Sequence, residues 1–206
     1  MCFMKKLAII GAGGHGKVIA DMAKKNGYER IAFLDDCNKD DFLGCYPIIG
    51  DTDIAVPEDY DFFIAIGNAE IRRKMTGKFS DRNIVTLIHP DAVIADGVKL
   101  GRGTCIMAGA VINPGVVIGE GCIVNTSSSV DHDSVLGDYV HVSVGAHIAG
   151  TVCVGDGTWV GIGAVISNNI SVCSNCMLGA GAVVVKDILT SGTYVGVPAR
   201  LIKLGD

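Results

Sequence analysis

The sequence has few aromatic residues and no excess of positive charge. Phe, Trp and Tyr make up 6% of its 206 residues, which is too few for a core built around stacked rings. Lys and Arg total 17 against 22 Asp and Glu, giving a net charge of −5. Proteins that bind nucleic acid carry a basic face, so this balance argues against a nucleic-acid partner.

Residues 157–185 contain no charged side chain and are numerous enough to span a bilayer. The segment nevertheless contains several Ser and Asn residues, and its apolar residues recur periodically. We therefore expect a repeat in water and no membrane partner. The N-terminus also lacks the cationic segment, apolar run and cleavage site of a signal peptide, which predicts a cytoplasmic protein.

The eight cysteines do not suggest disulfides, because cytoplasmic proteins normally keep their thiols reduced. Cys173 and Cys176 form a single CxxC pair with no second pair of ligands nearby, so we expect no metal. Cys122 and Cys176 occupy equivalent positions in the repeat described next, which predicts that they are small core side chains.

An aliphatic residue recurs every six positions along the second half of the chain, without an insertion. The seventeen positions are Ile88, Ile94, Leu100, Ile106, Ile112, Ile118, Val124, Val130, Leu136, Val142, Ile148, Val154, Val160, Ile166, Val172, Leu178 and Val184. Neither a helix nor a hairpin has this period, because helical side chains repeat about every 3.6 positions and those of a strand simply alternate. Short strands joined by tight turns do have it, and three such strands would close one triangular coil. The sequence therefore predicts a parallel β-helix over residues 88–188, with three hexads in each coil.

The first 87 residues lack this period and show an alternation of strands and helices. A buried strand at 6–10 leads into the turn Gly11-Ala12-Gly13-Gly14-His15-Gly16 and a helix that extends to about Asn26. Further strands are expected at 31–34 and 61–66, and a further helix at 69–78. Strand, Gly-rich turn, helix and strand in this order predict a Rossmann-like nucleotide-binding domain over residues 1–87.

The Gly-rich turn matches the dinucleotide fingerprint, with Asp35 and Asp36 about 20 residues further on. NAD is disfavoured because the domain has room for one mononucleotide half and because His15 occupies the turn. A nucleotide whose phosphates meet the helix N-terminus still fits, and Asp35 or Asp36 can accept hydrogen bonds from its ribose hydroxyls or its nucleobase. The alternative is that the glycines serve only to pack the helix against the strand.

The uninterrupted hexads and the segment Gly196-Val197-Pro198-Ala199-Arg200 resemble the hexapeptide-repeat acetyltransferase superfamily. The GAGGHG turn and segments 33–36, 60–68 and 125–128 resemble the bacterial UDP-4-amino-sugar N-acetyltransferases of bacillosamine synthesis. This resemblance implies a left-handed β-helix that binds acetyl-CoA, a C-terminal tail at 189–206, and a homotrimer. It also implies that a UDP-sugar pocket is lined by Gly13, Gly14, His15, Asp35, Asp36 and Gly67.

Acetyl transfer to an amine needs a base, and histidine suits that role near neutral pH. His132 lies at a corner between Asp131 and Asp133, whose charges can orient the imidazole and raise its basicity. The resemblance implies that His132 is the base and that Asp133 enhances it, at a position where relatives carry Glu. It further implies that acetyl-CoA contacts His141, Ile162 and Ala180. For His147 we expect a surface role.

Positions that are 18 apart, or one coil, should lie above one another. Gly150 then lies over His132, where its N–H is a candidate oxyanion donor to acetyl-CoA, and His141 stacks with Trp159. His132 and His141 are expected at different corners of one triangle, so one ligand reaches both only where two β-helices meet. This agrees with the implied homotrimer, with its sites between subunits.

The expected reaction moves acetyl from acetyl-CoA to the C4 amine of a UDP-4-amino-4,6-dideoxy-N-acetylhexosamine by direct attack. Sialic-acid-type O-acetylation and GDP-perosamine N-acetylation remain open, because the same two-domain plan and the same base would serve them, and the N-terminal pocket would discriminate between the acceptors. Two other classes are a non-catalytic nucleotide-sugar-binding β-helix, which would not need the His132–Asp133 pair, and a metal-dependent hydratase, which would need three converging histidines.

Overall fold

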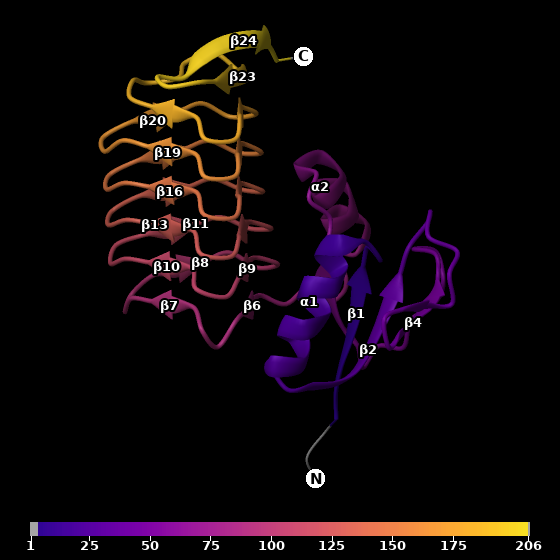
Figure 1. The fold of residues 1–206 in the computed structure, drawn as a ribbon. Helices are drawn as coiled ribbons and strands as arrows, with labels where there is room; N and C mark the ends of the chain where they lie inside the picture. Colours follow the sequence, from indigo (N-terminus) through magenta and orange to yellow (C-terminus); the bar gives the residue numbers. More distant parts are fainter. Residues whose placement is uncertain (1–3, 206) are drawn as a thin grey trace. The chain divides into compact units, whose positions relative to one another are not determined.

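The computed structural model describes residues 4–205, which form two compact units that divide after Pro90. The N-terminal unit contains a sheet with helices, and the second unit is built from stacked coils (Figure 1).

The N-terminal unit is organised around a sheet with strand order β3-β4-β2-β1-β5. The strands β1 (Lys5–Ile10), β2 (Tyr28–Leu34), β4 (Tyr46–Gly50) and β5 (Asp61–Ile64) are parallel, and β3 (Phe42–Leu43) pairs antiparallel with β4. Helix α1 (Gly14–Lys25) connects β1 to β2, and α2 (Ala69–Lys78) follows β5. Strand β6 (Leu87–Ile88) ends the unit. The predicted strand, Gly-rich turn, helix and strand are confirmed, whereas the β3–β4 hairpin was not expected.

Glycine is required at one position of the Gly-rich turn. A Cβ at Gly16 would collide with the carbonyl oxygen of Gly11, and it would lie 3.1 Å from Cε1 of Phe33 on β2. Helix α1 therefore approaches the end of β1 more closely than any side chain at this position would permit.

The second unit continues the predicted hexads as two-residue strands, each ending in a predicted aliphatic residue. They are β7 (Val93–Ile94), β8 (Lys99–Leu100), β9 (Cys105–Ile106), β10 (Val111–Ile112), β11 (Val117–Ile118), β12 (Ile123–Val124), β13 (Ser129–Val130), β14 (Val135–Leu136), β15 (His141–Val142), β16 (His147–Ile148), β17 (Cys153–Val154), β18 (Trp159–Val160), β19 (Val165–Ile166), β20 (Ser171–Val172), β21 (Met177–Leu178) and β22 (Val183–Val184). With β6, the predicted β-helix is confirmed strand by strand.

The strands form the three parallel sheets of a left-handed β-helix, in which each strand pairs with the strand one coil further on. Sheet one is β7-β10-β13-β16-β19-β22, sheet two is β8-β11-β14-β17-β20, and sheet three runs from β9 through β12, β15, β18 and β21. The charge-free segment 157–185 lies within these coils. Within residues 4–205, no helix combines the length and apolar character needed to span a membrane.

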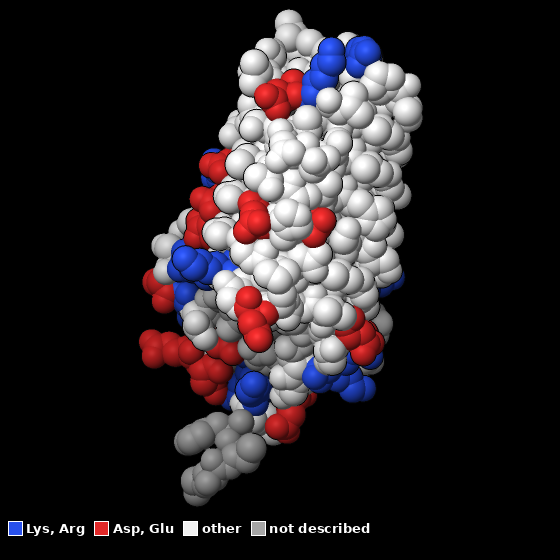
Figure 2. Space-filling model, turned by 90° about the vertical axis from the view of Figure 1, so that its left-hand side faces the viewer, with Lys and Arg blue, Asp and Glu red and all other residues white. Residues whose placement is uncertain are grey.

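The interior of the coils is aliphatic, with small or hydroxyl-bearing residues near the corners. Cys122 and Cys176 are buried there, as predicted. Thr104 is also buried, and its hydroxyl donates to the carbonyl of Gly119 at 2.9 Å and accepts from the N–H of Cys122 at 3.0 Å. Such hydroxyls form hydrogen bonds with main-chain groups of the turns that are buried in the interior. In the face shown in Figure 2, uncharged side chains cover most of the coils.

The predicted C-terminal tail contains a strand pair. β23 (Gly192–Val195) extends sheet three parallel to β21, and β24 (Arg200–Leu204) returns antiparallel to β23. The segment Gly196-Val197-Pro198-Ala199-Arg200 leads from one strand into the other.

The contact at Gly16 predicts that Gly16→Ala lowers the free energy of unfolding of the N-terminal unit by about 1–3 kcal/mol, because the added methyl group overpacks the turn. Thermal unfolding followed by circular dichroism measures this change. Gly14→Ala is the matched control, because a Cβ at Gly14 meets no atom within 4 Å. Equal melting temperatures for the two variants would contradict the prediction.

Candidate active site

His132 lies at the corner between sheets one and two, where β13 turns into β14. Its Nδ1 lies 2.9 Å from Oδ2 of Asp133, which adopts a left-handed φ of +58°. A carboxylate only accepts, so the imidazole donates from Nδ1 and keeps Nε2 as its acceptor nitrogen. Although Asp is one methylene shorter than Glu, it reaches the ring.

Asp131 lies on the other side of His132. Its Oδ1 accepts from the main-chain N–H of His132 at 2.8 Å and from Nδ2 of Asn113 at 2.7 Å. The hydrogen bond to Asp133 and the negative charge of Asp131 raise the pKa of His132 above its usual value. His132 is therefore a stronger base than an isolated imidazole.

Gly150 lies one coil above His132, as the stacking of positions 18 apart predicts. The N–H of Thr151 donates to the carbonyl of His132 at 2.8 Å, and a Cβ at Gly150 would lie 2.5 Å from Nε2 of His132. The imidazole thus lies directly against the main chain at Gly150. Among the described residues, no group accepts a hydrogen bond from the N–H of Gly150, which leaves it available as a donor.

His141 lies within sheet three, in β15, and not at a corner as the sequence analysis expected. Its ring stacks on Trp159 with centroids 4.8 Å apart, which leaves His141 9% exposed. The N–H of Thr126 donates to Oδ1 of Asn125, so the amide group of Asn125 donates to Nε2 of His141 over 3.2 Å. His141 therefore carries its proton on Nδ1 when neutral.

Ile162 and Ala180 form a column at the corner between sheets three and one. Gly181 N–H donates to the carbonyl of Ile162 at 2.8 Å, and the Ile162 side chain is 63% exposed. The column begins just beyond β18, which carries Trp159. The structure therefore brings the predicted acetyl-CoA contacts His141, Ile162 and Ala180 to one side of the coils. His132, Asp133 and Gly150 lie at the corner opposite sheet three.

The predicted sugar-binding residues of the Gly-rich turn lie at the start of α1. Gly13 is the N-cap residue, Gly14 begins the helix, and His15 follows in its first turn. Burial, followed by the charge of Arg72, lowers the pKa of His15 to about 4, so this imidazole is neutral at neutral pH. Its Nε2 is buried, and among residues 4–205 it has no hydrogen-bond partner.

Asp35 and Asp36 follow β2 and line a cavity of about 300 Å³. Burial raises the pKa of Asp35, but hydrogen bonds from three main-chain N–H groups outweigh it, and the net shift is downward. The pKa of Asp36 is lowered mainly by the N–H of Thr52, which donates at 2.8 Å. Both carboxylates therefore already bind main-chain groups, Asp35 in the Gly-rich turn and in its own loop and Asp36 at Thr52, in addition to any bond they offer a ligand.

Arg72 is a buried residue of this region that the sequence analysis missed. It is 1% exposed, and its Nη1 donates to the carbonyls of Ile66 and Gly67, each at 2.8 Å. Arg72 thereby holds the turn that contains the predicted site residue Gly67. Because Arg72 lies in the otherwise polar helix α2, nothing in the sequence indicated that its side chain would be buried. The partner of Asp131, by contrast, could have been predicted from the sequence, because Asn113 lies 18 positions, or one coil, before it.

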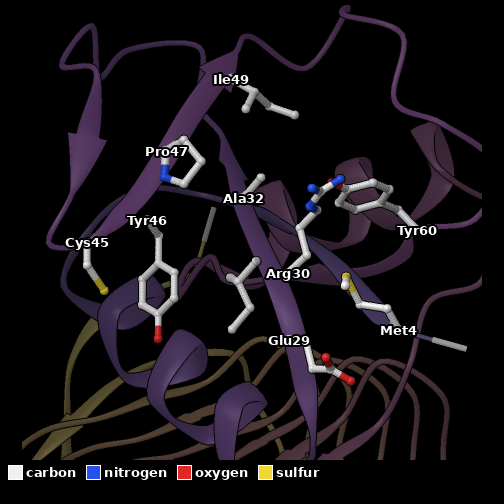
Figure 3. Close-up of a pocket in the computed structure, with 10 residues that line it drawn as sticks. Met4, Glu29, Arg30, Ala32, Cys45, Tyr46, Pro47, Ile49 and Tyr60 are labelled. Atoms are coloured by element: carbon white, nitrogen blue, oxygen red, sulfur yellow. The ribbon is translucent and has the colours of Figure 1, made fainter. Parts of the chain in front are cut away.

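A larger cavity of about 590 Å³ lies elsewhere in the N-terminal unit. Figure 3 shows Arg30 and Tyr60 on one side of it, and Tyr46 and Pro47 on the other. None of the predicted site residues lines it, so its size alone does not mark the site. Within the described part of the chain, no three His, Cys, Asp or Glu side chains gather as metal ligands.

Residues 6–79 match the family described as the PglD N-terminal domain. UDP-N-acetylbacillosamine N-acetyltransferase of Bacillus subtilis is 36% identical over 114 residues, which are 51% of this chain and 52% of that protein. The chain thus matches about half the length of this curated relative.

Two solved structures align over almost the whole chain. The acetyltransferase domain of PglB from Neisseria gonorrhoeae, in complex with acetyl coenzyme A, is 40% identical with a TM-score of 0.93 and covers 97% of this chain and 100% of its own. PerB from Caulobacter crescentus, in complex with CoA and GDP-perosamine, is 35% identical with a TM-score of 0.90 and covers 97% and 98%.

The pair formed by His132 and Asp133 predicts the effect of Asp133→Asn. Loss of the carboxylate removes the main cause that raises the pKa of His132, so its titration midpoint should fall. The fraction of His132 that is deprotonated then grows at pH 6–7. Histidine resonances followed by NMR across this range measure the midpoint. Asp21→Asn, the same charge change at an exposed residue of α1, is the control, and an equal shift in both variants would contradict the assignment.

Proposed function

Because this chain belongs to the hexapeptide-repeat sugar acetyltransferases, we propose that it moves acetyl from acetyl-CoA to the C4 amine of a UDP-4-amino-4,6-dideoxy-N-acetylhexosamine. The observation that carries this proposal is the corner at His132. There, Asp133 holds Nδ1 and leaves Nε2 as a proton acceptor beside Gly150. We also propose that this reaction takes place in the cytoplasm.

His132 is the proposed general base. The amine nitrogen attacks the thioester carbonyl carbon while Nε2 of His132 accepts the proton that the amine loses. The negative charge that Asp133 places at Nδ1 stabilises the resulting imidazolium. When the C–S bond breaks, the imidazolium returns the proton to the CoA sulfur, so the base is restored without an acetyl-enzyme.

Gly150 is the proposed oxyanion donor. Its N–H is available, and the absence of a side chain lets the imidazole of His132 lie against the main chain here, so a carbonyl that reacts beside Nε2 comes near this N–H. A fixed main-chain donor of this kind stabilises the charge that develops on the carbonyl oxygen.

His141, Ile162 and Ala180 are the proposed acetyl-CoA contacts. The Ile162–Ala180 column runs along the coils, which suits an extended pantetheine arm, and Ile162 offers an exposed apolar surface. Next to it, the His141–Trp159 stack provides a flat aromatic surface.

The nucleotide of the sugar is assigned to the N-terminal unit. Gly13, Gly14 and the neutral His15 surround the N-terminus of α1, which attracts phosphate. Asp35, Asp36 and Gly67 complete the proposed pocket. The full-length similarity to PerB favours a GDP-linked amino sugar as the second candidate acceptor, with the same base and cofactor.

A homotrimer supplies a complete site. In one chain, His132 lies at the corner opposite the sheet that carries His141, so the two face different directions. Exposed aliphatic side chains on the coils, among them Val117, Val135 and Ile162, are suited to contact between subunits. We place each site where the His132 corner of one subunit meets the acetyl-CoA column of its neighbour.

The proposed chemistry predicts that His132→Ala lowers kcat by about 100- to 10,000-fold, the usual contribution of a general base. The enzyme is incubated with acetyl-CoA and a panel of UDP- and GDP-linked amino sugars, and mass spectrometry detects acetylated product. Wild type should acetylate one UDP-4-amino sugar best.

His147→Ala is the control for this experiment, because His147 is an exposed histidine on the neighbouring strand β16. It should keep wild-type activity, and His132→Ala should still bind CoA in calorimetry. Activity of His132→Ala within a few-fold of wild type would show that another group is the base. Wild type that acetylates no sugar of the panel would overturn the proposed function.

Sites shared between subunits predict complementation between two inactive variants. His132→Ala removes the base and Ile162→Arg blocks the acetyl-CoA column, so each homotrimer should be inactive. Mixed trimers obtained by co-expression contain some sites with neither change and should regain part of the wild-type rate. Light scattering should give the mass of three chains. An active monomer, or no recovery in mixed trimers, would refute the shared site.

A further inference from the structure

We propose that Asn113 is a positioning residue for the base, acting through Asp131. Asn113 lies one coil below Asp131, and its side-chain amide holds the carboxylate to which the main chain of His132 is bound. This inference rests on the proposed role of His132 as the base.

The contact joins two coils at one carboxylate oxygen. Nδ2 of Asn113 donates to Oδ1 of Asp131 at 2.7 Å, and the N–H of His132 donates to the same oxygen at 2.8 Å. The main chain of Asn113 is held as well, because its N–H donates to the carbonyl of Val130 at 3.0 Å. The side-chain amide of Asn113 therefore projects from a main-chain position that is itself held by a hydrogen bond.

Main-chain hydrogen bonds to the neighbouring coils hold the turn at His132 as well, among them the one from the N–H of Thr151 to the carbonyl of His132 at 2.8 Å. The side chain of His132 is exposed, and its ring contacts Asp133 and the main chain at Gly150. The N–H of Asp133 donates to the carbonyl of Pro114 at 3.1 Å. The carboxylate of Asp131 accepts from the N–H of His132, so together with these main-chain bonds it determines from which point the imidazole projects. Acyl transfer is sensitive to such placement, because the base must meet the amine at hydrogen-bond distance.

An amide suits this position better than a charged side chain. It donates to Asp131 without adding a cation that would cancel the carboxylate's effect on His132, or an anion that would repel it. The charged or titratable groups on the adjoining turns and strands, besides Asp131 itself, are Asp133 beside the ring, Asp96 two coils below His132, His147 on β16 and Cys153 on β17. Corner residues 95–98, 113–116, 131–134 and 149–152 contain no Lys or Arg.

Asn113→Ala tests the proposal directly. We expect kcat to fall by about 5- to 20-fold, as for the loss of a hydrogen bond to a charged group, while KM for both substrates stays within twofold. Ser167→Ala is the matched control, because Ser167 occupies the equivalent position two coils beyond Asp131 and its hydroxyl donates to Oδ1 of the adjacent Asn168 at 3.4 Å. It should leave kcat unchanged. An equal loss in both variants would show a general effect on the coils.

Asn113→Asp separates positioning from mere packing, because it keeps the size of the side chain. Two facing carboxylates repel at neutral pH, but they share a proton and a hydrogen bond as the pH falls. The activity of this variant relative to wild type at the same pH should therefore rise between about pH 7.5 and pH 5.5. The relative activity of Asn113→Ala should stay flat.

An NMR titration of His132 provides a measurement that does not depend on turnover. When Asp131 is no longer held, its charge acts less on the imidazole, so the midpoint in Asn113→Ala should fall part of the way toward that of Asp131→Asn. An unchanged midpoint in Asn113→Ala overturns the proposal, as does a kcat within twofold of wild type while His132→Ala is inactive. If wild type acetylates no sugar, the proposed function fails and the titration alone decides on Asn113.

Discussion

The hydrogen bonds between successive coils are the interaction on which the site depends. Each coil donates main-chain N–H groups to the carbonyls of a neighbouring coil, so positions 18 apart are held in vertical columns. At the proposed active corner, Thr151 is bound to His132 and Asp133 is bound to Pro114 in this way. The position of His132 therefore depends on the register of the whole β-helix as well as on the contacts of its own turn.

Two histidines in the two units have opposite electrostatic environments. His132 is exposed between two carboxylates, which raise its pKa, whereas burial and the charge of Arg72 lower the pKa of His15 to about 4. A base that must take up a proton benefits from the first environment. A neutral side chain beside a helix N-terminus, where phosphate would bind, benefits from the second, because it can offer a hydrogen bond without titrating.

Much of the fold follows from patterns in the sequence, and the parts that do not have physical reasons. Every predicted hexad is a strand, because each turn of the solenoid repeats the same local requirement for one inward aliphatic residue. The β3–β4 hairpin lacks such a period and was missed. The buried Arg72 was missed as well, because an arginine in a short polar helix normally faces water and only tertiary packing encloses this one.

By itself, the sequence determined the columns. Counting in steps of 18 placed Gly150 over His132 and Trp159 over His141, since the register of a solenoid without insertions has no freedom. Tertiary structure decided which atoms within those columns meet. It bound Asp131 to Asn113, and in the N-terminal unit it bound the carboxylate of Asp35 to the main-chain N–H of Ala12. Side-chain rotamers and burial settle such contacts, and a repeat period carries no information about either.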